Sequence, residues 1–183
     1  MSRKYRIQDQ TQMYFVTFTV VNWIDVFIRD DYREIFTDSI KYCQQNKGLE
    51  VYAWCIMTSH IHLIIGTNGQ NKLQDIIRDL KAYTSRHLRK AIEDSNIESR
   101  KEWLLWMFER AGTYNSNNND FQLWQQHSHP IELSRGELVK QRLDYLHNNP
   151  VTAGFVTEPN HWKWSSAYDY SGGKGIVDII LIE

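Results

Sequence analysis

The chain has 183 residues, of which 42% are hydrophobic and 23% charged, and its formal net charge is −1. This length is sufficient for one domain with a sizeable core, and the composition is that of a globular protein. The near-zero net charge excludes a surface that is basic throughout. Any contact with nucleic acid would therefore require a local cluster of basic side chains.

Cysteine usage and hydropathy indicate a soluble, cytoplasmic protein without a membrane partner. Cys43 and Cys55 lie in apolar surroundings without a Cys-x-x-Cys pattern, and we expect both to be reduced core residues. Residues 1–12 are polar and lack the apolar core of a signal peptide. No apolar run approaches the roughly 20 residues that a membrane-spanning helix needs.

The first half of the chain predicts a strand, a helix and a strand pair. Residues 14–21 are rich in β-branched and aromatic side chains, which favour a strand. A helix is predicted from Asp30 to Lys47, where Gly48 ends it. Residues 49–57 and 59–66 form two further predicted strands. The turn between these two strands is so short that they must be antiparallel neighbours.

Three helices and one strand are predicted in the second half of the chain. Residues 72–93 carry an apolar stripe at helical spacing. Pro150 is expected to end the last long helix, because the residue before a proline avoids α geometry. The remaining predicted elements are a helix at 98–111, an Asn-rich loop at 112–120, a strand at 121–133, and the start of the last helix at its cap, Ser134.

Together these elements predict an α+β fold. The order β-α-β-β-α-β with an appended helix is the ferredoxin-like (split βαβ) arrangement, an antiparallel sheet with helices on one face. We expect a single domain over 1–183, with a core at about 14–158 and an aromatic and apolar tail at 159–183. The apolar end of that tail, 176–182, is interpreted as an extra edge strand or as a surface for a partner.

Two histidines in the third predicted strand form a candidate metal site. Side chains alternate along a strand, so His60, His62 and Ile64 share one face. Two residues of rise separate the imidazoles by roughly 6.5–7 Å, which allows both to bind one ion. The spacing alone is also typical of histidines on a partly wet sheet face.

A phenol and a carboxamide share one face of the last long helix. Arg142, Tyr145 and Asn149 follow one another at steps of three and four, and the last two lie one turn apart, about 6 Å along the axis. A free phenol has a pKa of about 10, so a tyrosine nucleophile needs assistance at neutral pH. A strand with two histidines and a helix with these groups are the parts of a metal-assisted tyrosine nucleophile.

In combination, these motifs resemble a known family. His60-Ile61-His62, followed much later by Asp144-Tyr145-x-x-x-Asn149-Pro150-Val151, is similar to the single-tyrosine transposases of the HUH superfamily, and closest to their REP-associated tyrosine transposase branch. The resemblance runs from about residue 14 to about residue 170.

The resemblance implies a function and a set of site residues. Tyr145 would be the nucleophile that forms a 5′-phosphotyrosine, and His60, His62 and Asn149 would hold Mg²⁺ or Mn²⁺. Members nick and rejoin single-stranded DNA at the foot of an imperfect hairpin, and they occur as monomers or as homodimers that exchange the tyrosine helix. The third ligand is often glutamine in the family, whereas this chain has the shorter Asn149.

The predicted DNA contacts are basic side chains. The polar side of the helix at 72–93 either is a solvated face or holds a DNA backbone. The residues predicted to bind DNA are Arg78, Lys81, Arg86 and Lys90 on that helix and Lys140 on the tyrosine helix.

The sequence also leaves rival site residues and rival functions open. His127 and His129 form a second pair with strand spacing, and His147 is a candidate base on another side of the tyrosine helix. Tyr83 and Tyr114 are rival nucleophiles, although Tyr83 continues the apolar stripe of its helix and is expected in the core, and Tyr114 falls in the Asn-rich loop. The rival functions are a replication-initiating or conjugative nickase and a non-enzymatic single-stranded nucleic-acid-binding module like those that recognise RNA. Such nickases usually carry extra domains, and the binder would have no use for the histidine pair.

Overall fold

The computed structural model describes residues 7–114, 120–126 and 128–182. Its strands are β1 (Tyr14–Thr19), β2 (Leu49–Ile56), β3 (His60–Thr67) and β4 (Ile131–Glu132). Its helices are α1 (Asp30–Lys47), α2 (Leu73–Asp94), α3 (Lys101–Thr113), α4 (Gly136–Thr152) and α5 (Ala167–Tyr170), with short 3-10 helices η2 (Val21–Trp23) and η3 (Pro159–His161). None of the described helices is long and apolar enough to cross a membrane.

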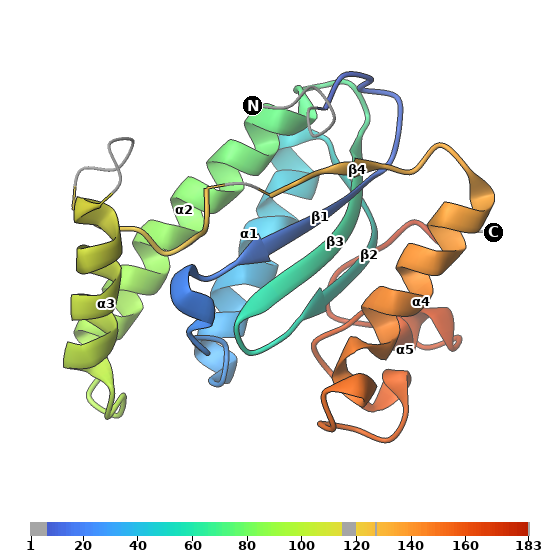
Figure 1. Cartoon of the computed structure of the whole chain (residues 1–183). Helices are drawn as coiled ribbons and strands as arrows, with labels where there is room; N and C mark the ends of the chain where they lie inside the picture. The colour runs from blue at the N-terminus through green and yellow to red at the C-terminus, as the bar shows by residue number, and fades with distance from the viewer. Residues whose placement is uncertain (1–6, 115–119, 127, 183) are drawn as a thin grey trace.

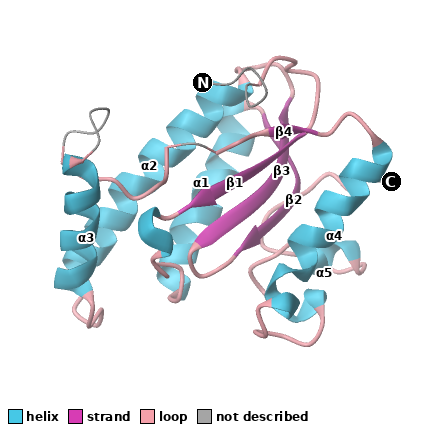
Figure 2. Cartoon of the chain, in the orientation of Figure 1, coloured by secondary structure: helices cyan, strands magenta, loops and turns pink. Residues whose placement is uncertain are grey.

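The strands form an antiparallel sheet in the order β2-β3-β1-β4 (Figure 1). This order places the first and third strands in the centre, as the split βαβ arrangement requires. The predicted ferredoxin-like α+β class is therefore confirmed. The strands run through the middle of the molecule, between helices on either side (Figure 2).

The two faces of the sheet carry different helices. Helices α1, α2 and α3 contribute to the main core, which takes alternate side chains of β1, β2 and β3. Helix α4 packs on the other face through a smaller cluster that includes Phe15, Ile64, Val139 and Leu146. Helix α4 is the helix that the prediction appended to the split βαβ core. It contacts the side chains of this second face.

Antiparallel pairing of β1 with β3 fixes which side chains lie on the face toward α4. Thr19 is opposite His60, Thr17 is opposite His62, and Phe15 is opposite Ile64. Opposite residues of an antiparallel pair point to the same side, so the two histidines and the two threonines share a face. In the centre of the same sheet, the other set of side chains is fully buried in the main core.

Two predicted elements have different limits in the structure. The strand predicted at 121–133 is reduced to β4, because Pro130 has no N–H for pairing and His129 has a left-handed backbone with φ of 40°. Helix α4 begins after Arg135 instead of at a Ser134 cap, and it continues through Pro150 to Thr152. Because Pro150 is buried, tertiary packing outweighs its local preference to end the helix.

The C-terminal residues do not form the predicted edge strand over 176–182. They cross beside β2 with one backbone hydrogen bond, in which the Ile180 N–H donates to the Val51 carbonyl at 2.9 Å. Val177 is buried in the main core, and Ile182 packs against the smaller cluster. The tail therefore packs back on the body, mainly through side chains.

Candidate active site

The two histidines of β3 lie next to each other at the end of the strand. The ring centroids of His60 and His62 are 4.8 Å apart. His62 is only 4% exposed, whereas His60 is partly accessible to solvent. The alternation of the strand thus directs both imidazoles toward one point on the α4 face.

Both imidazoles are neutral at pH 7. Burial, followed by the nearby charges of His60 and Arg142, lowers the pKa of His62 to about 3. Burial also lowers the pKa of His60, although a hydrogen bond with Asn149 acts in the opposite direction. A neutral imidazole has a lone pair free on one ring nitrogen, which is the form that binds metals.

Hydroxyl groups orient the two rings from behind. The Thr17 hydroxyl lies 2.9 Å from His62 Nδ1, and the Ser59 hydroxyl lies 3.2 Å from His60 Nδ1. If each Nδ1 carries the proton and donates to its hydroxyl, each Nε2 is left unprotonated. This arrangement is the usual one for histidines that bind a metal through Nε2.

Helix α4 brings Tyr145 and Asn149 to these rings. The Asn149 Nδ2 lies 3.2 Å from His62 Nε2, so the amide donates to the unprotonated ring nitrogen. The ring centroids of Tyr145 and His62 are 5.2 Å apart in an edge-to-face arrangement. Tyr145 is 48% exposed, so one side of its ring contacts the site while the rest remains open to solvent.

Arg142 adds a positive charge one turn before Tyr145. Its guanidinium lies over the Phe15 ring at 5.3 Å, and Phe15 in turn stacks on His62 with centroids 5.3 Å apart. Its buried Nε has no hydrogen-bond partner among the described residues. The site therefore combines two neutral imidazoles, an amide, an exposed phenol and one cation.

The amide and imidazoles suit a divalent ion. No group of three or more His, Cys, Asp or Glu side chains that could hold a metal occurs among the described residues, so a site at the histidine pair requires the Asn149 amide as its third ligand. At the histidine pair, rotating the Asn149 amide by half a turn would present its oxygen in place of Nδ2. The orientation of such an amide is determined by its hydrogen-bond partners. Two imidazoles and one oxygen leave coordination positions open for a substrate.

The candidate base His147 is turned away from the site. It is buried, its Nε2 lies 2.8 Å from the Ser166 hydroxyl, and its ring packs on Tyr170. These contacts hold α4 against the C-terminal segment. His147 thus has a structural environment, on the opposite side of the helix from Tyr145.

The rival tyrosines and the second histidine pair lie on other elements. Tyr83 is on α2, where it stacks on His87, and Tyr114 caps the end of α3. The prediction that Tyr83 is a core residue is wrong, since it is exposed. Of the second histidine pair, His129 is exposed after its left-handed turn, and His127 is outside the described residues.

The residues predicted to bind DNA do not form one cluster with the tyrosine. Arg78 is paired with Asp75 and Asp79, and the Lys81 ammonium donates to the Gln125 carbonyl at 2.7 Å, so a DNA contact would have to break that bond. Arg86, Lys90 and Lys140 are exposed. The first four belong to α2, on the other sheet face, and only Lys140 shares α4 with Tyr145.

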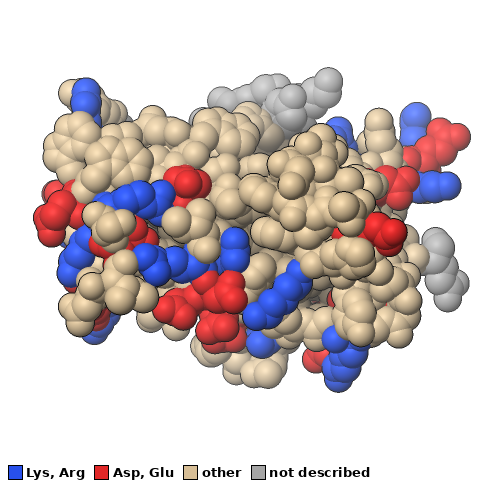
Figure 3. Space-filling view, turned by 90° about the horizontal axis from the view of Figure 1, so that it is seen from below, with Lys and Arg blue, Asp and Glu red and all other residues tan. Residues whose placement is uncertain are grey.

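One face of the molecule shows how the charges are distributed. Lys and Arg alternate with Asp and Glu on it, without a broad surface of one sign (Figure 3). This mixture agrees with the formal net charge of −1. Contacts to a DNA backbone on this face would therefore depend on individual cations.

Sequence reasoning missed four residues of this region. Thr17 could have been found, because pairing of the first and third strands puts it opposite a histidine. Arg142 shares the helical face of Tyr145, so its spacing also indicated it. Ser59 and Trp23, which both contact His60, gave no signal in the sequence because their positions depend on the turns around β3.

Comparisons with known proteins identify the family of the chain. A family model described as IS200-like transposase matches residues 10–109, more than half of the chain. A search of curated protein sequences gives no match.

A search of solved structures gives matches to two transposase structures. One is described as a REP-associated tyrosine transposase bound to a REP hairpin, with 15% sequence identity, a TM-score of 0.66, and coverage of 98% of this chain and 95% of that chain. The other is a putative transposase from Deinococcus radiodurans, with 18% identity, a TM-score of 0.45, and coverage of 81% and 95%. With the family match, the resemblance seen in the motifs is confirmed: the chain belongs to the IS200-like family of single-tyrosine HUH transposases and is an enzyme that acts on DNA.

Proposed function

We propose that the chain is a metal-dependent endonuclease and strand transferase for single-stranded DNA. Tyr145 is the nucleophile, and His60, His62 and Asn149 hold Mg²⁺ or Mn²⁺. One observation carries the proposal: on one sheet face, the Tyr145 ring lies 5.2 Å from the ring of His62, whose Nε2 faces the Asn149 amide at 3.2 Å.

The donor set fits a divalent ion, and phosphodiester chemistry favours Mg²⁺ or Mn²⁺. When bound, such an ion withdraws charge from a phosphodiester oxygen and fixes that phosphate for attack. The neutral state of His60 and His62 supports this role, since neither ring must lose a proton first. Thr17 and Ser59 hold the rings in the required orientation.

The reaction exchanges one phosphodiester for another. A bond forms between Tyr145 Oη and phosphorus, and the bond from phosphorus to the 3′ oxygen breaks. The phenol loses a proton and the 3′ oxygen gains one, so the products are a 5′-phosphotyrosine and a free 3′-hydroxyl. The bond energy is retained, and attack by a 3′-hydroxyl reverses the step to rejoin DNA.

Exposure and charge suit this role. Tyr145 is half exposed, so a DNA strand can reach its hydroxyl without unfolding of α4. Arg142 lies one turn before Tyr145, where its guanidinium can donate hydrogen bonds to a phosphate. Tyr145 and both histidines belong to one chain, which supports a site assembled in cis, without exchange of helices between the copies of a homodimer.

Single-stranded DNA with a palindromic hairpin is the proposed substrate. The structural neighbour with the TM-score of 0.66 is bound to a REP hairpin, and it covers 98% of this chain. This likeness supports our proposal that the chain belongs to the REP-associated branch and acts in the cytoplasm, where such DNA is available.

Covalent adduct formation tests the proposal. The protein is incubated with hairpin DNA and Mn²⁺, and a stable protein–DNA adduct is detected by denaturing electrophoresis. We expect an adduct with the wild type, none with Tyr145→Phe, and none after chelation of the metal. His62→Ala should also abolish it, because one of three ligands is lost.

Tyr83→Phe is the matched control, since it removes an exposed phenol of the same chain and should leave adduct formation intact. An undiminished adduct in Tyr145→Phe would remove the nucleophile assignment. DNA binding without any adduct, independent of metal, would instead favour the non-enzymatic binding module.

A further inference from the structure

Trp23 in η2 has a strained backbone and an exposed side chain. Its φ is 57°, and that of the preceding Asn22 is 55°, so two successive non-glycine residues are left-handed. Such conformations cost of order 1 kcal/mol or more and persist where surrounding structure imposes them, often at functional sites. The Trp23 side chain is nevertheless 60% exposed, so the turn does not serve to bury it.

This turn faces the proposed metal site on one side. The ring centroids of Trp23 and His60 are 5.4 Å apart, in an edge-to-face arrangement. A phosphate bound at the histidines would bring the neighbouring nucleotides of the same strand close to the free face of Trp23. The indole is thus the large, flat surface adjacent to the site where the strand would be cut.

On its other side, the turn lines a pocket with α3. Asn22 lines this pocket of about 430 Å³ together with Met107, Arg110, Ala111 and Tyr114. The Arg110 guanidinium lies 5.2 Å from the Trp106 ring centroid and 6.0 Å from that of Tyr114. The Arg110 side chain is exposed, so its charge faces solvent beside these two rings.

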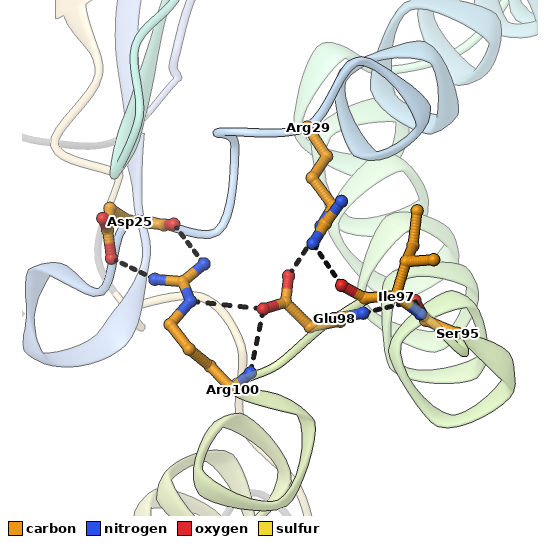
Figure 4. Close-up of polar contacts among 6 residues, drawn as sticks. All are labelled: Asp25, Arg29, Ser95, Ile97, Glu98 and Arg100. Carbon is orange, nitrogen blue, oxygen red and sulfur yellow. Dashed lines mark hydrogen bonds and ion pairs between the residues drawn. The ribbon is translucent and has the colours of Figure 1, made fainter.

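A network of charged residues holds the two walls of this pocket together (Figure 4). Arg100 donates to the Asp25 carboxylate at 2.7 Å, and to Glu98 at 3.3 Å. Glu98, almost fully buried, also accepts from Arg29 at 3.0 Å. Asp25 follows η2, and Arg100 precedes α3, so the network fixes Trp23 and Arg110 relative to each other.

We propose that Trp23 and Arg110 bind an unpaired segment of the DNA strand next to the scissile phosphate. Trp23 stacks on one base, and Arg110 binds a backbone phosphate further along the strand. The inference rests on the proposed function and adds the path of the strand to it.

A nucleotide strand fits these features better than an apolar partner would. Aromatic side chains combined with unpaired cations are the usual means of binding single-stranded DNA, since every base has a flat face. The stacked guanidinium of Arg110 is also typical of nucleic-acid binding. A volume of about 430 Å³ is within the range of small-molecule sites, so a single base or sugar can enter.

The experiment measures binding of a hairpin oligonucleotide with unpaired flanks of mixed sequence, in a Tyr145→Phe background with Mn²⁺. Trp23→Gly removes the ring, while glycine accepts the positive φ without strain. We expect Trp23→Gly to weaken binding by about 5- to 100-fold, the usual effect of losing one stacked base, and Trp23→Phe to retain part of the affinity. Tyr42→Ala, which removes an exposed ring from α1, should have no effect.

Abasic nucleotides identify the stacked base. The flank positions are replaced by an abasic site one at a time, and one position next to the cleavage point should weaken binding with Trp23 present but not in Trp23→Gly. Equal affinities of Trp23→Gly and its parent would overturn the inference. The inference would also be overturned if Trp23→Gly bound every abasic oligonucleotide more weakly than the parent protein by the same factor. Stacking on one base predicts that this difference disappears at a single abasic position.

Arg110 is tested by the salt dependence of the same binding. Arg110→Gln should reduce the slope of log K against log [salt] by about 0.7 to 1, as for one phosphate contact, and Lys41→Gln on α1 should leave it unchanged. An unchanged slope in Arg110→Gln would remove that contact. Adduct formation with Tyr145 present is measured in parallel: an adduct without any effect of Trp23 rejects the inference alone, whereas no adduct rejects the proposed function.

Discussion

Asn149 offers the two histidines a short carboxamide, whose Nδ2 lies 3.2 Å from His62 Nε2. Metal binding would reverse the amide and use its oxygen. We expect Asn149→Ala to weaken Mn²⁺ binding by about 10- to 100-fold, the range measured for lost groups around metal sites. Asn149→Asp should bind Mn²⁺ more tightly, because it adds a negative charge. Isothermal titration calorimetry measures both.

The neighbouring Asn148 provides the control for this prediction. It is exposed on the same helix, and its amide donates to the Asp144 carbonyl. Asn148→Ala should therefore leave Mn²⁺ affinity unchanged. Equal affinities of Asn149→Ala and wild type would exclude Asn149 as a ligand.

His147 makes the stability of the protein depend on pH. Burial lowers its pKa to about 4, whereas an imidazole in the unfolded chain has a pKa of about 6.5. Between these values the unfolded state binds more protons than the folded state. The contribution of neutral His147 to the free energy of unfolding is therefore complete above pH 6.5 and is lost as the pH falls toward 4. This residue should contribute a loss of about 2 kcal/mol between pH 7 and pH 5.

Urea denaturation at the two pH values measures this effect. In His147→Gln, the side chain can still donate to Ser166 but no longer titrates. The difference in free energy of unfolding between pH 7 and pH 5 should therefore be smaller by about 2 kcal/mol than in the wild type. An identical pH dependence in this variant would show that His147 is not buried in its neutral form.

At the scale of residues, alternation along one strand and spacing along one helix indicated side chains that the structure brings together. The same rules predict that His60 and His62 share a face and that Arg142, Tyr145 and Asn149 share another. Trp23 could not be predicted this way, since its contact with His60 depends on two left-handed residues in a turn. Such conformations are set by the surrounding fold and leave no periodic pattern.

Among the elements, the connection between α2 and α3 depends on Glu98. Burial alone would raise the pKa of this carboxyl, but hydrogen bonds from Arg29 and Arg100 outweigh burial, and the pKa lies below its ordinary value. We expect Glu98→Gln to lower the free energy of unfolding by about 1–3 kcal/mol, because two guanidinium groups lose their carboxylate. Urea denaturation at pH 7 measures the difference.

Glu102→Gln is the matched control, on the exposed side of α3. It should change the free energy of unfolding by less than about 0.5 kcal/mol. A similarly small effect of Glu98→Gln would mean that the network does not fix α3.

The long periodic elements were predicted within a few residues, and the short ones were not. Helices α1 and α2 have continuous apolar stripes, which local spacing reveals. Strand β4 and the end of α4 depend on two prolines whose effects differ: Pro130 interrupts pairing, whereas Pro150 is accommodated because it is buried. Only the packing of distant segments decides between these outcomes.

For the whole molecule, we propose that the described residues form one folding unit. The tail joins both clusters of apolar side chains, through Val177 on one sheet face and Ile182 on the other. The sequence predicted the class of fold from the order of its elements. That order alone did not indicate which helix would cover the histidine face; the combined motifs of His62 and Asn149, which lie more than eighty positions apart, did so.

The docking of α4 on its own sheet has a kinetic consequence. If the proposed nucleophile Tyr145 and the proposed metal ligands His60 and His62 act within one copy of the chain, strand cleavage at saturating DNA should be first order in protein. Diluting the enzyme tenfold would then leave the rate constant for adduct formation unchanged, as quenched-flow sampling can measure. A rate constant that falls in proportion to enzyme concentration would require a second copy to supply the tyrosine.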